Sequence, residues 1–108
     1  TSFFGSERIP AYTASKAGIA QLTKALSNEW ARSGVNVNAI APGYMATKLT
    51  QDIKEKNPKQ YQEITSRIPA GRWGTGEDLK GLAVFLASDA SAYISGAVIP
   101  VDGGYLGK

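Results

Sequence analysis

Two short apolar segments, separated by a long stretch with helical patterns, limit the fold more than any other feature of this sequence. The first, Val35–Ala41, is rich in β-branched residues and ends at Pro42-Gly43, and the second is Ala97–Val101. Both patterns predict β-strands. The length of the connection favours a parallel pair, as found in an α/β sheet. Two strands are too few for such a sheet, because a parallel sheet is normally built from several strands and covered on both faces.

Helical patterns lie on both sides of the first strand. Ala11–Ser33 contains no proline, and its apolar residues recur at helical spacing between Pro10 and Gly34, which are typical start and stop signals. Tyr44–Pro69 is polar and bears several lysines, with a break at Asn57-Pro58. We therefore expect one long helix before the strand and two short helices after it, which form an exposed cover.

The last part of the chain combines a loop, a helix and the second strand. Glycine and proline residues in Arg67–Gly76 predict a loop, and Thr75 with Asp78 resembles a capping box that starts a helix ending near Ser88. Pro100 lacks the N–H donor that a strand ladder needs, so we expect the second strand at a sheet edge.

Composition excludes several kinds of catalytic site. The 108 residues include no His and no Cys, which removes thiolate nucleophiles, serine–histidine relays and zinc sites made of Cys and His. Any acid–base chemistry would rest on Tyr, Lys, Ser, Thr or carboxylates. The formal net charge of +3 comes from interspersed charges of both signs, so we expect no nucleic-acid partner, whereas a small anionic ligand would fit.

The sequence shows no targeting signal. It has no apolar run long enough to span a membrane and no secretory signal pattern, so we expect no membrane association and a cytoplasmic location. The chain starts at Thr1 instead of Met and enters a helical pattern almost at once, which fits a piece of a longer protein.

Tyr12 and Lys16 form the first candidate site. Residues four apart on a helix share a face, with Cβ atoms about 5–6 Å apart. A nearby ammonium group stabilises the phenolate and lowers the pKa of a tyrosine from about 10, so the tyrosine can act as a general acid or base without histidine. The same spacing also fits a tyrosine and a lysine on a solvated helix face, and spacing alone does not distinguish the two.

The segment Asn38–Thr47 is the second candidate. It runs from the end of the first strand through Pro42-Gly43 into the following loop. Ligands in open α/β sheets bind beyond the carboxyl ends of the strands, where a Pro-Gly turn lets the backbone approach a flat ring closely. An ordinary strand-ending turn has the same pattern, although the presence of both candidates in one short sequence is harder to explain by chance.

Further motifs follow Tyr12 and Lys16 along the chain. They are N-V-N-A-I-A-P-G-Y-M-A-T, G-R-W-G, F-L-A-S-D-A-S-A-Y-I-S-G and V-D-G-G. In order and spacing, this series resembles the C-terminal half of a short-chain dehydrogenase/reductase over essentially the whole chain. The resemblance implies an α/β fold, the C-terminal portion of a Rossmann-type doubly wound parallel sheet. It also implies that residues 1–108 are the C-terminal half of one domain, whose N-terminal dinucleotide-binding half is absent.

The resemblance further implies NAD or NADP as the cofactor, no metal, and a role for each matching residue. Tyr12 would exchange a proton with the substrate oxygen, while Lys16 would hold the nicotinamide ribose and lower the pKa of the tyrosine. Pro42-Gly43 would line the nicotinamide. The Met45 backbone and the Thr47 hydroxyl would fix its carboxamide.

The chain departs from the family pattern at several points. The family's catalytic serine would fall before Thr1, and Ser2 stands at the wrong spacing to replace it. The glycine-rich phosphate loop and the residue that selects between NAD and NADP are also absent, so we expect the isolated chain to be inactive. Gly76 stands where the family usually has proline, and Asn38 is expected to be structural.

A sugar acid is the expected substrate. The segments Asn28–Ala31, Ala41–Thr47 and Arg67–Gly74 most resemble the sugar-acid dehydrogenases of the family. Lys48 and Arg72 are candidates to meet a substrate carboxylate, although solvent-exposed charges are the simpler interpretation of both. A 3-oxoacyl reductase or another alcohol dehydrogenase of the family stays open, as does a non-catalytic oligomerisation module. Because the long helix and the edge strand resemble the family's tetramer surfaces, we expect a homotetramer.

Overall fold

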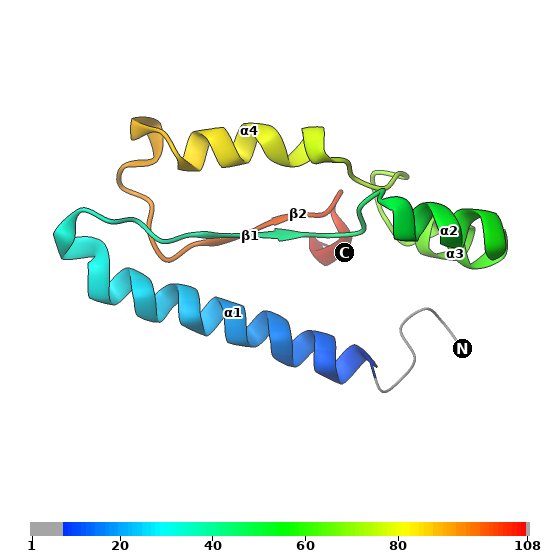
Figure 1. Cartoon of the computed structure of the whole chain (residues 1–108), viewed down its shortest axis with the longest axis horizontal. Coiled ribbons are helices and arrows are strands. Elements are labelled where there is room, and N and C mark those ends of the chain that lie inside the picture. Colours follow the sequence, from blue (N-terminus) through cyan, green and yellow to red (C-terminus); the bar gives the residue numbers. More distant parts are fainter. Residues whose placement is uncertain (1–7, 108) are drawn as a thin grey trace. The chain divides into compact units, whose positions relative to one another are not determined.

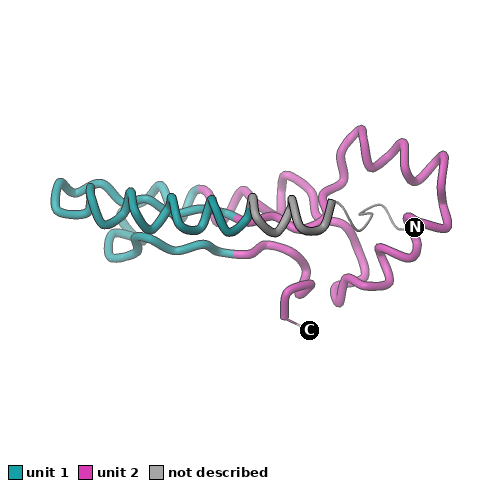
Figure 2. Tube along the Cα trace, turned by 90° about the horizontal axis from the view of Figure 1, so that it is seen from below, with its two compact units in different colours: residues 1–40, 84–99 teal, residues 41–83, 100–108 magenta. Residues whose placement is uncertain are grey.

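The computed structural model describes residues 8–107, with side chains from Lys16 onward. Its main elements, shown in Figure 1, are α1 (Arg8–Trp30), β1 (Ala39–Pro42), α2 (Lys48–Lys56), α3 (Pro58–Ser66), α4 (Gly76–Leu86) and β2 (Val98–Val101). Short 3-10 turns follow α1, α4 and β2 at Ala31–Ser33, Asp89–Ser91 and Tyr105–Gly107. The chain divides into two compact units, coloured in Figure 2: unit 1 is residues 1–40 and 84–99, and unit 2 is residues 41–83 and 100–108.

Helix α1 begins at Arg8, before the expected start at Ala11, and so includes Pro10 in its first turn. Proline is tolerated there because the first N–H groups of a helix have no acceptor within the helix. The other end is as predicted, since a 3-10 turn leads from α1 into Gly34. This glycine has a φ of 79° and donates its N–H to the Ala31 carbonyl, a termination that favours glycine.

Strands β1 and β2 form the predicted parallel pair. Ala39 N–H donates to the Ala97 carbonyl at 2.8 Å, and Gly43 N–H donates to the Val101 carbonyl at 3.0 Å. Donor and acceptor advance in the same direction along both segments, which is the register of parallel strands. Because alternate residues of a strand direct their backbone groups to opposite sides, Pro100 faces away from β1, as expected for an edge strand.

Strand β1 is shorter than predicted, because residues 35–38 lie outside it. The Asn38 side chain replaces the missing part of the ladder. Its Oδ1 accepts the Ala97 N–H at 3.0 Å, and its Nδ2 donates to the Ile94 carbonyl at 3.1 Å. An asparagine amide offers both a donor and an acceptor, so it can satisfy backbone groups as a strand would. These hydrogen bonds bear out the structural role expected for Asn38.

In unit 2, helices α2 and α3 lie side by side as a hairpin (Figure 1), which confirms the two predicted short helices. Asn57 separates them: its N–H donates to the Ile53 carbonyl at 2.8 Å, and its Oδ1 accepts the Gln60 N–H at 3.2 Å. One residue therefore ends α2 and begins α3, and Pro58 follows at the first position of α3, where proline is favoured.

Helix α4 ends at Leu86, before the predicted end near Ser88. The Ser88 N–H and hydroxyl both donate to the Phe85 carbonyl, at 3.1 Å and 2.7 Å. These bonds span one residue fewer than the α-helical bond, so they tighten the chain and stop the helix.

The two units differ in what they bury. Among the described residues, the buried apolar side chains all lie in unit 2, and they are Ile64, Ile68 and Trp73. Within residues 16–40 and 84–99 of unit 1, the buried residues are polar, and they are Thr23, Ser27 and Ser91. No helix within residues 8–107 is both long enough and apolar enough to cross a membrane.

Candidate functional site

The residues of the predicted site belong to both units. Tyr12 and Lys16 are part of α1 in unit 1, whereas Pro42–Thr47 is part of unit 2. On α1 the two residues share a face, about one turn apart, and Lys16 is half-buried. The Tyr12 side chain lies outside the described side chains, so the pairing of its phenol with the Lys16 ammonium stays a prediction.

Gly43 packs closely against the chain that follows β2. A Cβ atom at this position would lie 2.7 Å from the Asp102 Cβ and 2.9 Å from the Asp102 Cα. Because these distances are too short for real atoms, any larger residue would force the backbone apart. The close approach predicted at Pro42-Gly43 was to a flat ring, whereas the group that Gly43 approaches in the structure is Asp102 of the same chain. Lining of a nicotinamide by these two residues stays a prediction.

Met45 forms a parallel bridge with Gly74. Gly74 N–H donates to the Tyr44 carbonyl at 2.8 Å, and Ala46 N–H donates to the Gly74 carbonyl at 2.7 Å. Since the neighbours of Met45 make both bonds, the N–H and carbonyl of Met45 itself face the opposite side. One donor and one acceptor side by side match the two polar groups of a carboxamide. Binding of a nicotinamide carboxamide by the Met45 backbone stays a prediction.

Thr47 begins helix α2. Its Oγ1 accepts the Thr50 N–H at 3.3 Å, and the Thr50 Oγ1 accepts the Thr47 N–H at 2.6 Å. This reciprocal capping box fixes the angle at which the Pro42–Thr47 segment enters the helix. The Thr47 hydroxyl acts as an acceptor here, so its proton is still suited to donation toward a ligand.

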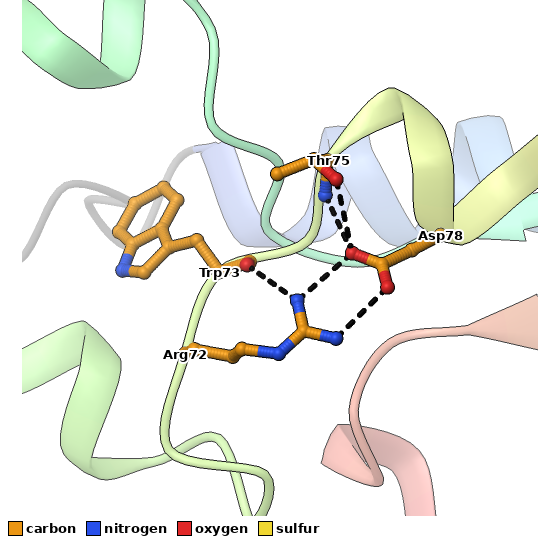
Figure 3. A network of polar contacts seen from close by, with 4 residues as sticks. All are labelled: Arg72, Trp73, Thr75 and Asp78. Atoms are coloured by element: carbon orange, nitrogen blue, oxygen red, sulfur yellow. Dashed lines mark hydrogen bonds and ion pairs between the residues drawn. The ribbon is translucent and has the colours of Figure 1, made fainter.

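Arg72, a candidate to meet a substrate carboxylate, binds a carboxylate of this chain instead. Its two terminal nitrogens lie 2.8 Å from the two oxygens of Asp78 (Figure 3). This guanidinium, helped by the Thr75 N–H, holds the pKa of Asp78 well below its usual range, and Asp78 raises the pKa of Arg72. Lys48, the other candidate, is exposed at the first position of α2.

An aromatic cluster around Trp73 joins the helical cover to the loop after β1. The Trp73 ring stacks on Tyr61 of α3 at a centroid distance of 4.9 Å and meets Tyr44 edge-on at 5.2 Å. Its Nε1 donates to the Thr65 hydroxyl at 2.7 Å. The sequence patterns did not identify Trp73 as part of a core. The signal in the sequence that could have identified it is a large aromatic residue in a glycine-rich loop, because such a side chain favours burial.

A model of the protein family described as Enoyl-(Acyl carrier protein) reductase matches residues 2–106. Two relatives have another description. The 2-dehydro-3-deoxy-D-gluconate 5-dehydrogenases of Dickeya dadantii and Escherichia coli are 55% and 54% identical to this chain over 107 residues. Each alignment covers 99% of this chain and 42% of the relative, so the chain spans less than half the length of these relatives.

A solved structure has a similar fold and sequence. It is a crystal structure of a protein from Agrobacterium tumefaciens, assigned as a 2-deoxy-D-gluconate 3-dehydrogenase, with bound NADP. The two proteins are 54% identical, and the match covers 92% of this chain and 40% of that one, with a TM-score of 0.83.

Proposed function

The chain belongs to the short-chain dehydrogenase/reductase family, and from this premise we propose that it forms the C-terminal half of a domain that oxidises a secondary alcohol of a sugar acid with NAD or NADP. The observation that carries the proposal is the 55% identity to the Dickeya dadantii 2-dehydro-3-deoxy-D-gluconate 5-dehydrogenase over 99% of this chain. NADP bound to the Agrobacterium tumefaciens protein supports a nicotinamide cofactor. The dinucleotide-binding half would correspond to the part of the relatives that this chain does not match.

Tyr12 and Lys16 would carry out the acid–base step. Tyr12 takes the proton of the substrate hydroxyl during oxidation and returns it during reduction, through its phenolic oxygen. Lys16 lowers the pKa of this phenol by placing a positive charge near it, and it also holds the nicotinamide ribose. The position of both residues on one face of α1 supports this assignment.

The Pro42–Thr47 segment would hold the nicotinamide end of the cofactor, whose bound ring supplies hydride acceptance and donation. The Met45 N–H and carbonyl face away from Gly74 and fit a carboxamide. The Thr47 hydroxyl adds a donor from the residue that caps the start of α2. Pro42-Gly43 forms the adjoining surface, with Gly43 held by the bond from its N–H to the Val101 carbonyl.

The helical cover formed by α2 and α3 would close over the substrate. Lys48 is exposed on this cover and offers a cation to the carboxylate of a sugar acid. Arg72 is a weaker candidate than the sequence suggested, because Asp78 already binds both of its terminal nitrogens. We further propose a cytoplasmic homotetramer that assembles through α1 and β2.

The Tyr12→Phe variant of the whole protein that carries these residues tests the proposal. Wild type should reduce NAD or NADP with a sugar acid and should act poorly on a 3-oxoacyl thioester. Tyr12→Phe should lower turnover at least about 100-fold, because it removes the proton-transferring oxygen, while the Kd of the reduced cofactor changes little. Absorbance of the reduced cofactor measures turnover.

Tyr93→Phe is a matched control, because Tyr93 is fully exposed. It should keep wild-type activity. A fully active Tyr12→Phe variant contradicts the catalytic assignment, and faster turnover of the thioester favours a 3-oxoacyl reductase. Association with a homologous subunit without any nucleotide binding would favour a non-catalytic oligomerisation module.

A further inference from the structure

Hydrogen bonds tie together the residues on both sides of Gly74 (Figure 3). Arg72 holds both carboxylate oxygens of Asp78 at 2.8 Å and also donates to the Trp73 carbonyl at 3.2 Å. Asp78 accepts the Thr75 N–H at 2.8 Å and the Thr75 hydroxyl at 3.3 Å. We call these four residues, Arg72, Trp73, Thr75 and Asp78, the Gly74 clamp. The clamp fixes the backbone immediately before and after Gly74.

The residue inside the clamp is the one that positions the loop after β1. Gly74 uses its N–H and its carbonyl to bind Tyr44 and Ala46, at 2.8 Å and 2.7 Å. Two hydrogen bonds hold this bridge, so its geometry depends on how rigidly the backbone around Gly74 is held. The direction of the Met45 backbone, which lies between Tyr44 and Ala46, depends on the same bridge.

The exposure of the clamp indicates that it acts on geometry more than on overall stability. The side chains of Arg72 and Asp78 are 62% and 30% exposed. Ion pairs in contact with water contribute little to the free energy of unfolding. A bidentate pair of guanidinium and carboxylate, however, restricts both side chains to one relative orientation. The Thr75 contacts pass this restriction to the backbone at the start of α4.

We propose that Arg72 and Asp78 are positioning residues which, through Gly74, hold the Met45 backbone where it meets the nicotinamide carboxamide. This inference rests on the proposed function and deepens it, since it assigns recognition of the nicotinamide end to side chains that act through the backbone. The adenine end of the cofactor would bind elsewhere. Loss of the clamp should therefore weaken binding of the complete cofactor and spare a cofactor fragment that lacks nicotinamide.

Two substitutions in the whole protein test the proposal. Asp78→Asn keeps one oxygen to accept the Thr75 N–H but removes the charge, and Arg72→Lys keeps the charge but removes the forked geometry. Titration calorimetry would give the Kd of NADH and of ADP-ribose, or of NADPH and 2′-phospho-ADP-ribose. We expect both variants to raise the Kd of the reduced cofactor about tenfold, which is the effect of losing roughly one hydrogen bond to the ligand. The Kd of the fragment should change less than about twofold.

Glu63→Gln serves as the matched control, because it breaks another exposed ion pair of unit 2, at 3.1 Å from Arg67, that lies outside the clamp. It should bind both ligands as wild type does. Unchanged Kd values for both clamp variants would overturn the proposal, and so would equal weakening of cofactor and fragment, which indicates a general loss of structure. A wild-type protein that binds neither ligand would instead refute the proposed function on which the inference rests.

Discussion

Among the side chains that the structure describes, unit 1 and unit 2 bury opposite kinds. Unit 2 encloses Trp73, 6% exposed, together with Ile64 and Ile68, both 4% exposed. In unit 1 the buried groups are hydroxyls, such as Ser27, which lies 2.6 Å from the Ser95 hydroxyl, and Thr23, which donates to the Ile19 carbonyl at 2.7 Å. Unit 1 also exposes large apolar side chains: Ile19, Leu22, Trp30, Val35, Val84, Phe85 and Tyr93.

This difference shows in which unit the described apolar side chains form a buried core. Burial of apolar surface is the main favourable contribution to folding. Unit 2 gains that contribution from its own side chains, whereas the buried side chains described in unit 1 are polar and are held by hydrogen bonds. We therefore expect packing substitutions to be severe in unit 2 and mild in unit 1 when the 108-residue chain is studied.

Removal of the Trp73 ring should have the largest effect. Trp73→Ala leaves a cavity beside Tyr61 and Tyr44 and removes the indole donor to the Thr65 hydroxyl, which keeps its own bond to the Tyr61 carbonyl. It should lower the free energy of unfolding by about 3–5 kcal/mol. Leu22→Ala, at a side chain that is 59% exposed, should cost less than about 1 kcal/mol. Urea unfolding followed by circular dichroism measures both. Equal losses would show that the contrast between the units is wrong.

Substitution of one glycine in each unit should give the second-largest change in stability. Gly43→Ala in unit 2 places a Cβ 2.7 Å from that of Asp102, and the forced backbone shift should cost about 1–3 kcal/mol. Gly18→Ala in α1 of unit 1 meets nothing within 4 Å, so it should stabilise the helix by up to about 1 kcal/mol. Thermal melting should move in opposite directions for the two variants. A stabilising Gly43→Ala would refute the close packing of the loop after β1.

Removal of side-chain hydrogen bonds is the corresponding test of unit 1. Asn38→Ala leaves the Ala97 N–H and the Ile94 carbonyl without their partner, which should cost about 1–2 kcal/mol. Asn36→Ala removes one exposed bond to the Ala92 carbonyl and should cost about half as much. Hydrogen exchange of the Ala97 amide should accelerate in the first variant alone. Unchanged exchange would mean that Asn38 does not protect this backbone.

The elements predicted from the sequence were those whose signals lie close together along the chain. Gly34 marks the end of α1, and Asn57-Pro58 divides the cover, because both act through local backbone geometry. Strand β1 was predicted, but its start was placed at Val35 instead of Ala39, since Asn38 replaces the ladder by bonding residues far away in the sequence. The ion pair between Arg72 and Asp78 was not predicted from the sequence either. The two residues are separated by a loop, and the spacing rules for helices and strands do not describe the shape of a loop.

The smallest expected effect is on the loss of stability in acid. Arg72 and the Thr75 N–H hold the pKa of Asp78 below its ordinary value. Because the pKa is lower in the folded state than in the unfolded one, the clamp stabilises the fold above the unfolded pKa, and this contribution is lost as the pH falls through the folded-state pKa. Asp78→Asn should therefore weaken the drop in stability below about pH 4.

Urea unfolding of the 108-residue chain at about pH 7 and about pH 3 would measure this acid dependence. Glu63→Gln breaks an exposed ion pair outside the clamp, at 3.1 Å from Arg67, so it should leave a larger share of the acid dependence intact. If the two variants lose stability in acid equally, the Asp78 carboxylate does not contribute through the clamp. A selective effect of Asp78→Asn would instead place an acid-sensitive contact in unit 2, the unit that otherwise depends on apolar packing.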